Sequence, residues 1–273
     1  RNQLNSHAAL MERHLNTDVM TIISPILPGL EIRVRDALQK IDPRKPGLSI
    51  ILDTEGGIVE VVERMVDTIR HHYKEVVFVI PNRAMSAGTV FVMSGDRILM
   101  DFFSCLGPID PQIEKDGKLV PALSYLNQFE RLNGKAANGV LTSAEYALLS
   151  KLDLGELYQF EQARALSKDL LIQWLSKYKF KDWNKTEMRA VPVTPEMKKQ
   201  RAGEIAELLS KNDYWHSHGR GINMQVLKDL IGLKIEDFSA TPELAKGVRD
   251  YFELLRDYMQ RSQSISFVHT REY

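Results

Sequence analysis

The sequence has 273 residues, and its 36 Lys and Arg residues balance 36 Asp and Glu residues, so the formal net charge is zero. That balance disfavours a polybasic nucleic-acid binder, because phosphate binding needs an excess of cationic surface. Hydrophobic residues make up 44% and charged residues 26%, which is typical of a globular protein rather than a disordered one.

The sequence contains one cysteine, Cys105. A disulfide within the chain is therefore excluded, and so is a zinc site built from several thiolates. A lone cysteine is consistent with a reducing compartment, so we expect a cytoplasmic location, while a signal or anchor outside this sequence stays open. There is no run of about 18 or more apolar residues, so we expect no membrane span in this chain.

Short apolar runs alternate with amphipathic stretches over the first hundred residues. The first seventeen residues are expected to form an N-terminal arm. Beyond it, strands are predicted at 19–23, 48–52, 76–80 and 97–100, and helices at 30–41, over 58–69 and from about 86. Alternation of this kind predicts an α/β fold, with a parallel sheet covered on both faces and right-handed crossover helices.

The second half of the sequence is predicted to be largely helical. Helical stretches are predicted at 142–178, 196–210, 224–231 and from Pro242, with a loop at 212–221. We expect one domain over 18–261, followed by a C-terminal tail at 262–273. Apolar faces in this helical half also favour a homo-oligomer.

Two turns of small residues follow neighbouring predicted strands. Gly56-Gly57 follows the second strand, and Ser86-Ala87-Gly88 follows the third. Ligands of parallel sheets bind beyond the carboxyl ends of the strands. The ordinary interpretations are a helix N-cap for Ser86 and a tight turn for the glycines. The functional interpretation is a nucleophile beside main-chain N–H groups that stabilise a developing negative charge.

Three motifs around these turns resemble a known group of enzymes. They are Leu52–Gly57 (LDTEGG), Arg83–Thr89 (RAMSAGT) and Ser104–Gln112 (SCLGPIDPQ). Their order and spacing resemble the Clp-type and signal-peptide-peptidase-A-type serine peptidases, and within that clan the serine dehydrogenase proteinase family. The resemblance runs from about Thr17 to Gln112 and continues more weakly over 215–233. It implies a ClpP/crotonase-like fold with a helical C-terminal half.

The resemblance also implies a role for each matching residue. Ser86 would be the nucleophile, and the N–H groups of Gly57 and Ala87 would form the oxyanion hole. Substrate would lie as an added strand beside Gly56 and Gly57. Glu55 departs from the pattern, since relatives usually carry Pro there. We find no phosphate loop or dinucleotide fingerprint, and we expect no cofactor, no metal and no ATP requirement of the chain by itself.

The general base is left open by the sequence. Clp-type enzymes carry a His shortly after the fourth strand, but Gly107–Asp110 contains none. Enzymes like signal peptide peptidase A use a Lys, for which Lys151 is the main candidate and Lys168 an outside one. His216 and His218 lie near the place where Clp-type enzymes carry the third member of the triad. The ordinary interpretations are a solvated helix face for each Lys and a structural role for each His.

Three functions remain open from the sequence. The first is a serine endopeptidase that hydrolyses peptides or unfolded protein segments through Ser86, without a nucleic-acid partner. The second is a non-catalytic oligomeric module of the same fold, favoured by the missing Clp-type histidine. The third is a crotonase-type acyl-CoA enzyme, which is disfavoured because those enzymes do not need a serine at the position of Ser86.

Overall fold

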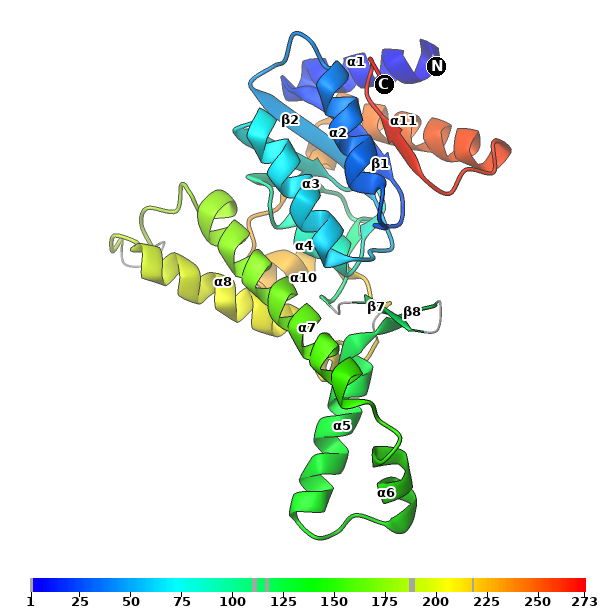
Figure 1. The fold of residues 1–273 in the computed structure, drawn as a ribbon. Helices are drawn as coiled ribbons and strands as arrows, with labels where there is room; N and C mark the ends of the chain where they lie inside the picture. Colours follow the sequence, from blue (N-terminus) through cyan, green and yellow to red (C-terminus); the bar gives the residue numbers. More distant parts are fainter. Residues whose placement is uncertain (1, 110–111, 116–117, 187–189, 218) are drawn as a thin grey trace.

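The computed structural model describes residues 2–109, 112–115, 118–186, 190–217 and 219–273 (Figure 1). Its centre is a six-stranded sheet in the order β10-β5-β3-β2-β1-β11. The strands are β1 (Asp18–Ile23), β2 (Gly47–Asp53), β3 (Glu75–Val79), β5 (Arg97–Met100), β10 (Glu236–Asp237) and β11 (Phe267–His269). All neighbours pair in parallel except β11, which is antiparallel to β1. The predicted parallel α/β sheet and its four central strands are confirmed.

Alternate side chains of the strands enter two separate cores, as the twofold repeat of a strand requires. Ile22, Ile50 and Phe78 point into the larger core. That core is covered by α2 (Leu30–Lys40), α3 (Val59–His72), α4 (Ala87–Val92) and the C-terminal half of α7 (Leu154–Trp174). Val19 and Val77 point into the smaller core, under α1 (Asn2–Leu15) and α11 (Pro242–Arg261). The sheet is thus covered on both faces, as expected.

The helical second half includes a projecting arm. In Figure 1, α5 (Ala122–Ala137) and α6 (Ser143–Leu149) extend away from the sheet, and α7 runs back toward it. The other helices described in this half are η1 (Leu175–Lys179, a π-helix), α8 (Pro195–Leu209), α9 (Asn212–Trp215), α10 (Met224–Asp229) and η2 (Phe238–Ala240). The predicted loop at 212–221 therefore begins with the short helix α9.

Both ends of the chain pack onto the sheet. The expected N-terminal arm is the helix α1, whose Leu4, Ala8 and Met11 are buried against α11. The expected tail contains β11, where His269 lies opposite Thr21 of β1. The two termini lie close together at one end of the molecule in Figure 1. The division into arm, domain and tail stays a prediction.

Two small sheets complete the fold. One joins β4 (Arg83–Ala84), β6 (Cys105–Leu106) and β9 (Ile222–Asn223) in the order β4-β6-β9. The other is the hairpin of β7 (Gln112–Lys115) and β8 (Lys118–Pro121). Because β4 follows β3 directly, the first small sheet lies beyond the carboxyl ends of the central strands. It thereby holds the segment that carries Ser86.

Candidate active site

Ser86 occupies a strained turn between β4 and α4. Its φ is 51° and its ψ is −117°, a conformation that residues with a Cβ rarely adopt. A serine in a sharp, strained strand-to-helix turn is the arrangement called a nucleophile elbow. The side chain makes no capping hydrogen bond to the N–H groups of α4. The strain therefore has no explanation in helix capping, and strain of this kind is typical of functional positions.

The Gly56 turn lies directly against the Ser86 turn. A Cβ added to Gly56 would lie 2.5 Å from Met85 O, 2.9 Å from Ser86 Cβ and 3.3 Å from Ala87 N. Gly56 also has a φ of 93°, which disfavours any other residue. The two turns singled out in the sequence thus meet at the carboxyl ends of β2 and β3, with main chain against main chain.

Thr54 fixes the register between the two turns. Its N–H donates to Arg83 O at 3.0 Å, and its carbonyl accepts from Met85 N–H at 3.0 Å. Its hydroxyl accepts from Gly56 N–H at 3.1 Å. A Cβ on Gly88 would lie 2.4 Å from Thr54 Cγ2, so α4 begins in close contact with this threonine. The N–H of Gly56 is occupied within the turn and is not available to a substrate.

The N–H groups of Gly57 and Ala87 are placed differently. Ile26 N–H donates to Gly56 O at 2.8 Å, and Ile58 N–H donates to Ile26 O at 2.9 Å. Gly57 lies between the two residues, Gly56 and Ile58, that make these hydrogen bonds, so it is the residue paired with Ile26 in a parallel bridge. The N–H of a residue in that position is directed away from the neighbouring strand, so Gly57 N–H points away from Ile26. Among the described residues, no acceptor takes a hydrogen bond from either Gly57 N–H or Ala87 N–H. These are the two donors that the resemblance implied.

The third motif packs against the same turn. Thr89 Oγ1 lies 2.8 Å from both Ala84 O and Gly107 O, and it accepts from Gly107 N–H at 3.0 Å. A Cβ on Gly107 would lie 2.8 Å from Met85 Cε. One threonine hydroxyl therefore ties the Ser86 turn to the segment after β6. The structure brings all three sequence motifs together.

Charged and polar side chains surround the turns. Glu55 and Arg83 form an exposed ion pair beside Gly56. Asp53 accepts from Asn82 Nδ2 at 3.0 Å, and burial raises the pKa of the Asp53 carboxyl. Burial likewise raises the pKa of the half-buried Cys105 thiol, which disfavours the thiolate and makes this cysteine a poor nucleophile.

Ser86 itself is almost completely covered, with a relative exposure of 1%. Small neighbours, Ala87 and Gly88, form the start of a fully buried α4. The described conformation is therefore closed to a polypeptide substrate. Access to the hydroxyl requires a local opening of the chain that covers it.

The candidate bases lie at several different places. Lys151 is exposed in the turn between α6 and α7, in the projecting arm of Figure 1. Lys168 on α7 pairs with Glu207 of α8 at 2.7 Å. His216 is exposed, with a φ of 61°, while His218 lies outside the described residues. The assignment of a base stays a prediction.

Burial gives one other lysine an altered pKa. Desolvation lowers the pKa of Lys179 to about 8. Its Nζ lies 3.5 Å from Asp96 O, just before the first residue of β5. Ser86 lies beyond the opposite, carboxyl ends of the strands, so Lys179 belongs to a different region. Among the described residues, no group of His, Cys, Asp and Glu side chains is arranged to hold a metal ion.

Comparison with a known family agrees with the motifs. Residues 30–151 match the family model described as ClpP-like SDH-type serine proteinase. That range includes Gly56, Gly57, Ser86, Ala87 and Gly107. The resemblance identified from the three motifs is confirmed for this part of the chain, which is similar in sequence to ClpP-like SDH-type serine proteinases.

Two uncharacterized proteins of Methanocaldococcus jannaschii are similar in sequence. MJ1495 is 27% identical over 121 residues, which is 44% of this chain and 39% of that protein. MJ0137 is 30% identical over 137 residues, which is 47% of this chain and 46% of that protein. The chain thus matches less than half the length of either relative.

Among solved structures, ClpP1 from Listeria monocytogenes aligns with a TM-score of 0.43 and 13% identity, over 84% of this chain and 95% of that one. A mutant of the 1510-N membrane-bound stomatin-specific protease aligns with a TM-score of 0.45 and 14% identity, over 84% and 82%. Within the described part of this chain, no helix has the length and apolar character needed to cross a membrane.

Proposed function

We propose that this protein is a serine endopeptidase that hydrolyses peptides or unfolded protein segments through Ser86. The observation that carries the proposal is the strained Ser86 turn in contact with Gly56, beside the N–H groups of Gly57 and Ala87, which donate to no acceptor among the described residues. The family match over 30–151 supports it. The main chain alone supplies the oxyanion donors, so no metal or cofactor is required for this chemistry.

The reaction follows from that arrangement. Ser86 Oγ attacks the scissile carbonyl carbon while a base accepts the hydroxyl proton. The carbonyl oxygen becomes an oxyanion between Gly57 N–H and Ala87 N–H. Collapse of the adduct breaks the peptide C–N bond, and the base returns the proton to the leaving amine. Water then hydrolyses the acyl ester and restores the Ser86 hydroxyl.

Labelling with a fluorophosphonate serine probe tests the proposal. Wild-type protein should form one covalent adduct, located at Ser86 by peptide mass spectrometry, and Ser86→Ala should form none. Ser94→Ala is the matched control, because Ser94 is equally buried but its hydroxyl only donates to Phe91 O at 2.7 Å. Equal labelling of wild type and Ser86→Ala would remove Ser86 from the mechanism.

The base is proposed to be Lys151 or His218. A lysine in this role must lose its proton near neutral pH, so the arm that carries Lys151 would have to approach Ser86 during opening. Lys151→Met and His218→Ala should be compared across the pH range. The variant in which the labelling rate no longer rises with pH identifies the base, and an unchanged rise in both variants excludes both residues.

A non-catalytic module of the same fold is the second candidate, and the burial of Ser86 favours it. Under that proposal the wild type would show no Ser86-dependent labelling at any pH, although the protein is folded by circular dichroism. Labelling that accelerates when a peptide substrate is added would instead support a closed enzyme that opens on binding.

We also propose a homo-oligomer located in the cytoplasm. The projecting arm formed by α5, α6 and the start of α7 has large apolar side chains that are exposed: Val140, Tyr146, Leu148, Leu154 and Tyr158. An exposed apolar group of this kind is typical of a surface covered by another chain. Light scattering should give a mass above that of one chain, and Leu148→Glu with Leu154→Glu should lower it. A monomeric wild type would contradict the oligomer.

A further inference from the structure

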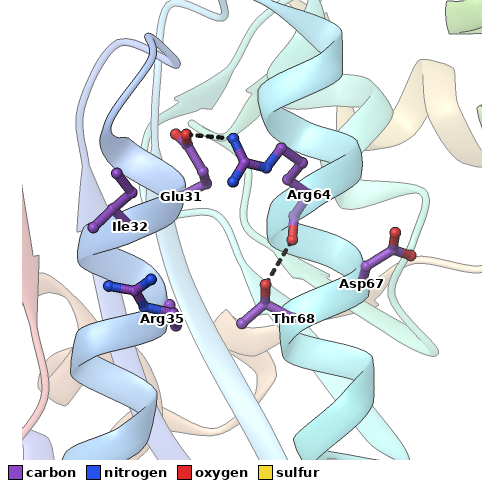
Figure 2. Close-up of a pocket in the computed structure, with 6 residues that line it drawn as sticks. All are labelled: Glu31, Ile32, Arg35, Arg64, Asp67 and Thr68. Carbon is purple, nitrogen blue, oxygen red and sulfur yellow. Dashed lines mark hydrogen bonds and ion pairs between the residues drawn. The ribbon is translucent and has the colours of Figure 1, made fainter.

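A charged groove lies between α2 and α3, the helix that follows Gly56 and Gly57 in the sequence. It has a volume of about 250 Å³ and is lined by Glu31, Ile32, Arg35, Arg64, Asp67 and Thr68 (Figure 2). Figure 2 shows Glu31 of α2 reaching across to Arg64 of α3. Arg35 pairs with Asp36 instead. Glu31 and Arg64 thus form an ion pair across the groove, and that pair connects α2 to α3.

Glu31 makes two contacts through its two carboxylate oxygens. Oε1 accepts from Arg64 Nη1 at 3.1 Å, and Oε2 accepts from Gly29 N–H at 2.8 Å. The Glu31 side chain is 7% exposed, whereas that of Arg64 is 70% exposed. One buried carboxylate therefore connects the turn before α2 to the helix that follows the Gly56-Gly57 segment.

The turn that Glu31 contacts through Gly29 also contains Ile26, the residue on which Gly57 packs. Ile26 lies three residues before Gly29, and its main chain accepts and donates the two bonds that hold residues 56–58. A Cβ on Gly57 would lie 2.1 Å from Ile26 O, so Gly57 rests on Ile26 without any gap. A shift of Ile26 must therefore shift Gly57 and the direction of its N–H.

We propose, on the basis of the peptidase function above, that Glu31 and Arg64 are positioning residues for the Gly57 oxyanion donor. The ion pair joins the two sides of the Ile26–Gly57 bridge, namely the turn before α2 on one side and α3 on the other. Neither residue contacts the substrate. The two residues set the angle at which Gly57 N–H meets the negative charge that develops on the carbonyl oxygen. That charge is absent from the ground state, so substrate binding does not depend on this angle.

The experiment compares Glu31→Ala with Glu12→Ala. Glu12 is a matched control, because its side chain is also 7% exposed and it pairs with Arg271 at 2.9 Å, but it lies on α1 on the opposite face of the sheet. The rate of Ser86 labelling at saturating fluorophosphonate and the probe concentration for half-saturation are measured for each folded variant.

Glu31→Ala should lower the saturating rate about tenfold while leaving the half-saturating concentration within about twofold. Arg64→Lys, which keeps the positive charge, should retain more of the wild-type saturating rate than Arg64→Ala. Equal rates for Glu31→Ala and Glu12→Ala would overturn the proposal, as would an effect confined to the half-saturating concentration.

Hydrogen exchange separates this inference from the peptidase function. The amide of Ile58 donates to Ile26 O, so Glu31→Ala should accelerate its exchange, and Glu12→Ala should not. Unchanged exchange at Ile58 overturns the positioning role even if the wild type is an active peptidase. Absence of Ser86-dependent labelling in the wild type overturns the peptidase function, whatever the exchange shows.

Discussion

The two ends of the sheet are built by different kinds of interaction. At the carboxyl ends, Gly56 and Ser86 meet through main-chain atoms, and Thr54 and Thr89 supply the hydrogen bonds between segments. At the amino end of β5, Arg70 and Asp96 form a buried ion pair at 2.8 Å. A buried ion pair of side chains lies at the amino end of β5, whereas the Gly56 and Ser86 turns at the carboxyl ends meet through main-chain contact.

The difference indicates which end of the sheet has a structural role and which end has a strained backbone typical of a functional site. The amino end has the arrangement of a structural network: Asp96 also accepts from Val76 N–H at 2.7 Å, and the Arg70 guanidinium lies 3.7 Å from the Tyr178 ring centre. The carboxyl end has a serine with φ of 51° and two N–H groups, those of Gly57 and Ala87, that donate to no acceptor in the described part of the chain. Substitutions at the first end should therefore change stability, and those at the second should change reactivity.

The largest effect is expected from Gly56→Ala. The added Cβ would lie 2.5 Å from Met85 O and must push the two turns apart. We expect Ser86 labelling to fall at least about a hundredfold, the scale of losing an oxyanion donor. Gly139→Ala is the control, because Gly139 also has a positive φ, 67°, but has open space around it. Similar labelling by both variants would show that main-chain contact at Gly56 is not required.

This contact was predictable from the sequence, because the topology of a parallel sheet brings the carboxyl ends of adjacent strands together. The four central strands were predictable for a related reason: their uninterrupted apolar runs are required for burial on both faces. By contrast, β10 and β11 lie at the sheet edges and have two and three residues. Segments that short carry no periodic signal, and their pairing depends on the helices around them.

Tertiary charge contacts were not predictable. Glu31 and Arg64 are 33 residues apart, and each looks like an ordinary charged residue on an amphipathic helix. Thr54 and Thr89 lie within recognised motifs, but their hydrogen bonds depend on the exact approach of two turns. A lysine acts as a base only where the fold desolvates it, so the sequence around Lys151 leaves its role open.

The second prediction concerns Asp96. Asp96→Ala leaves the buried Arg70 guanidinium without its carboxylate partner, so the free energy of unfolding should fall by about 3–5 kcal/mol. Urea denaturation measures this loss. Asp250→Ala, in the exposed Lys246–Asp250 pair, should cost less than about 1 kcal/mol. Ser86 labelling of folded Asp96→Ala should stay within about twofold of wild type, and a much larger fall would mean that the two ends are coupled.

The third prediction is a pH dependence of stability at Lys179. Its pKa is about 8 in the folded protein and 10.5 ordinarily. Below pH 8 the folded protein must keep this buried amine charged, which destabilises it. Between pH 8 and 10.5 the folded state releases the proton first, so stability rises with pH.

Lys179→Met removes that cost. At pH 7 the variant should be more stable than wild type by on the order of 3 kcal/mol, and the difference should shrink between pH 8 and 10.5. Denaturation at several pH values measures it. Lys177→Met, at an exposed position on the same turn, should show no such trend. A constant difference across the pH range would mean that desolvation of Lys179 is not the cause.

The smallest effect is expected at the exposed Glu55–Arg83 ion pair, which lies beside Gly56 at the carboxyl end of the sheet. Because both side chains are largely exposed, Glu55→Ala should change the free energy of unfolding by less than about 1 kcal/mol. Removal of the carboxylate leaves Arg83 without this partner beside Gly56. Hydrolysis of peptides with an acidic residue near the scissile bond should then rise about threefold relative to basic ones, and the gain should weaken at high salt.

The double variant Glu55→Ala/Arg83→Ala tests the origin of that preference. It removes both charges, so the preference for acidic peptides should disappear while the overall rate stays within about twofold of wild type. If the double variant keeps the acidic preference, the charge that attracts the peptide lies elsewhere. If Glu55→Ala shows no preference at all, substrate does not pass beside Gly56, and the main-chain end of the sheet selects its substrates without help from charge.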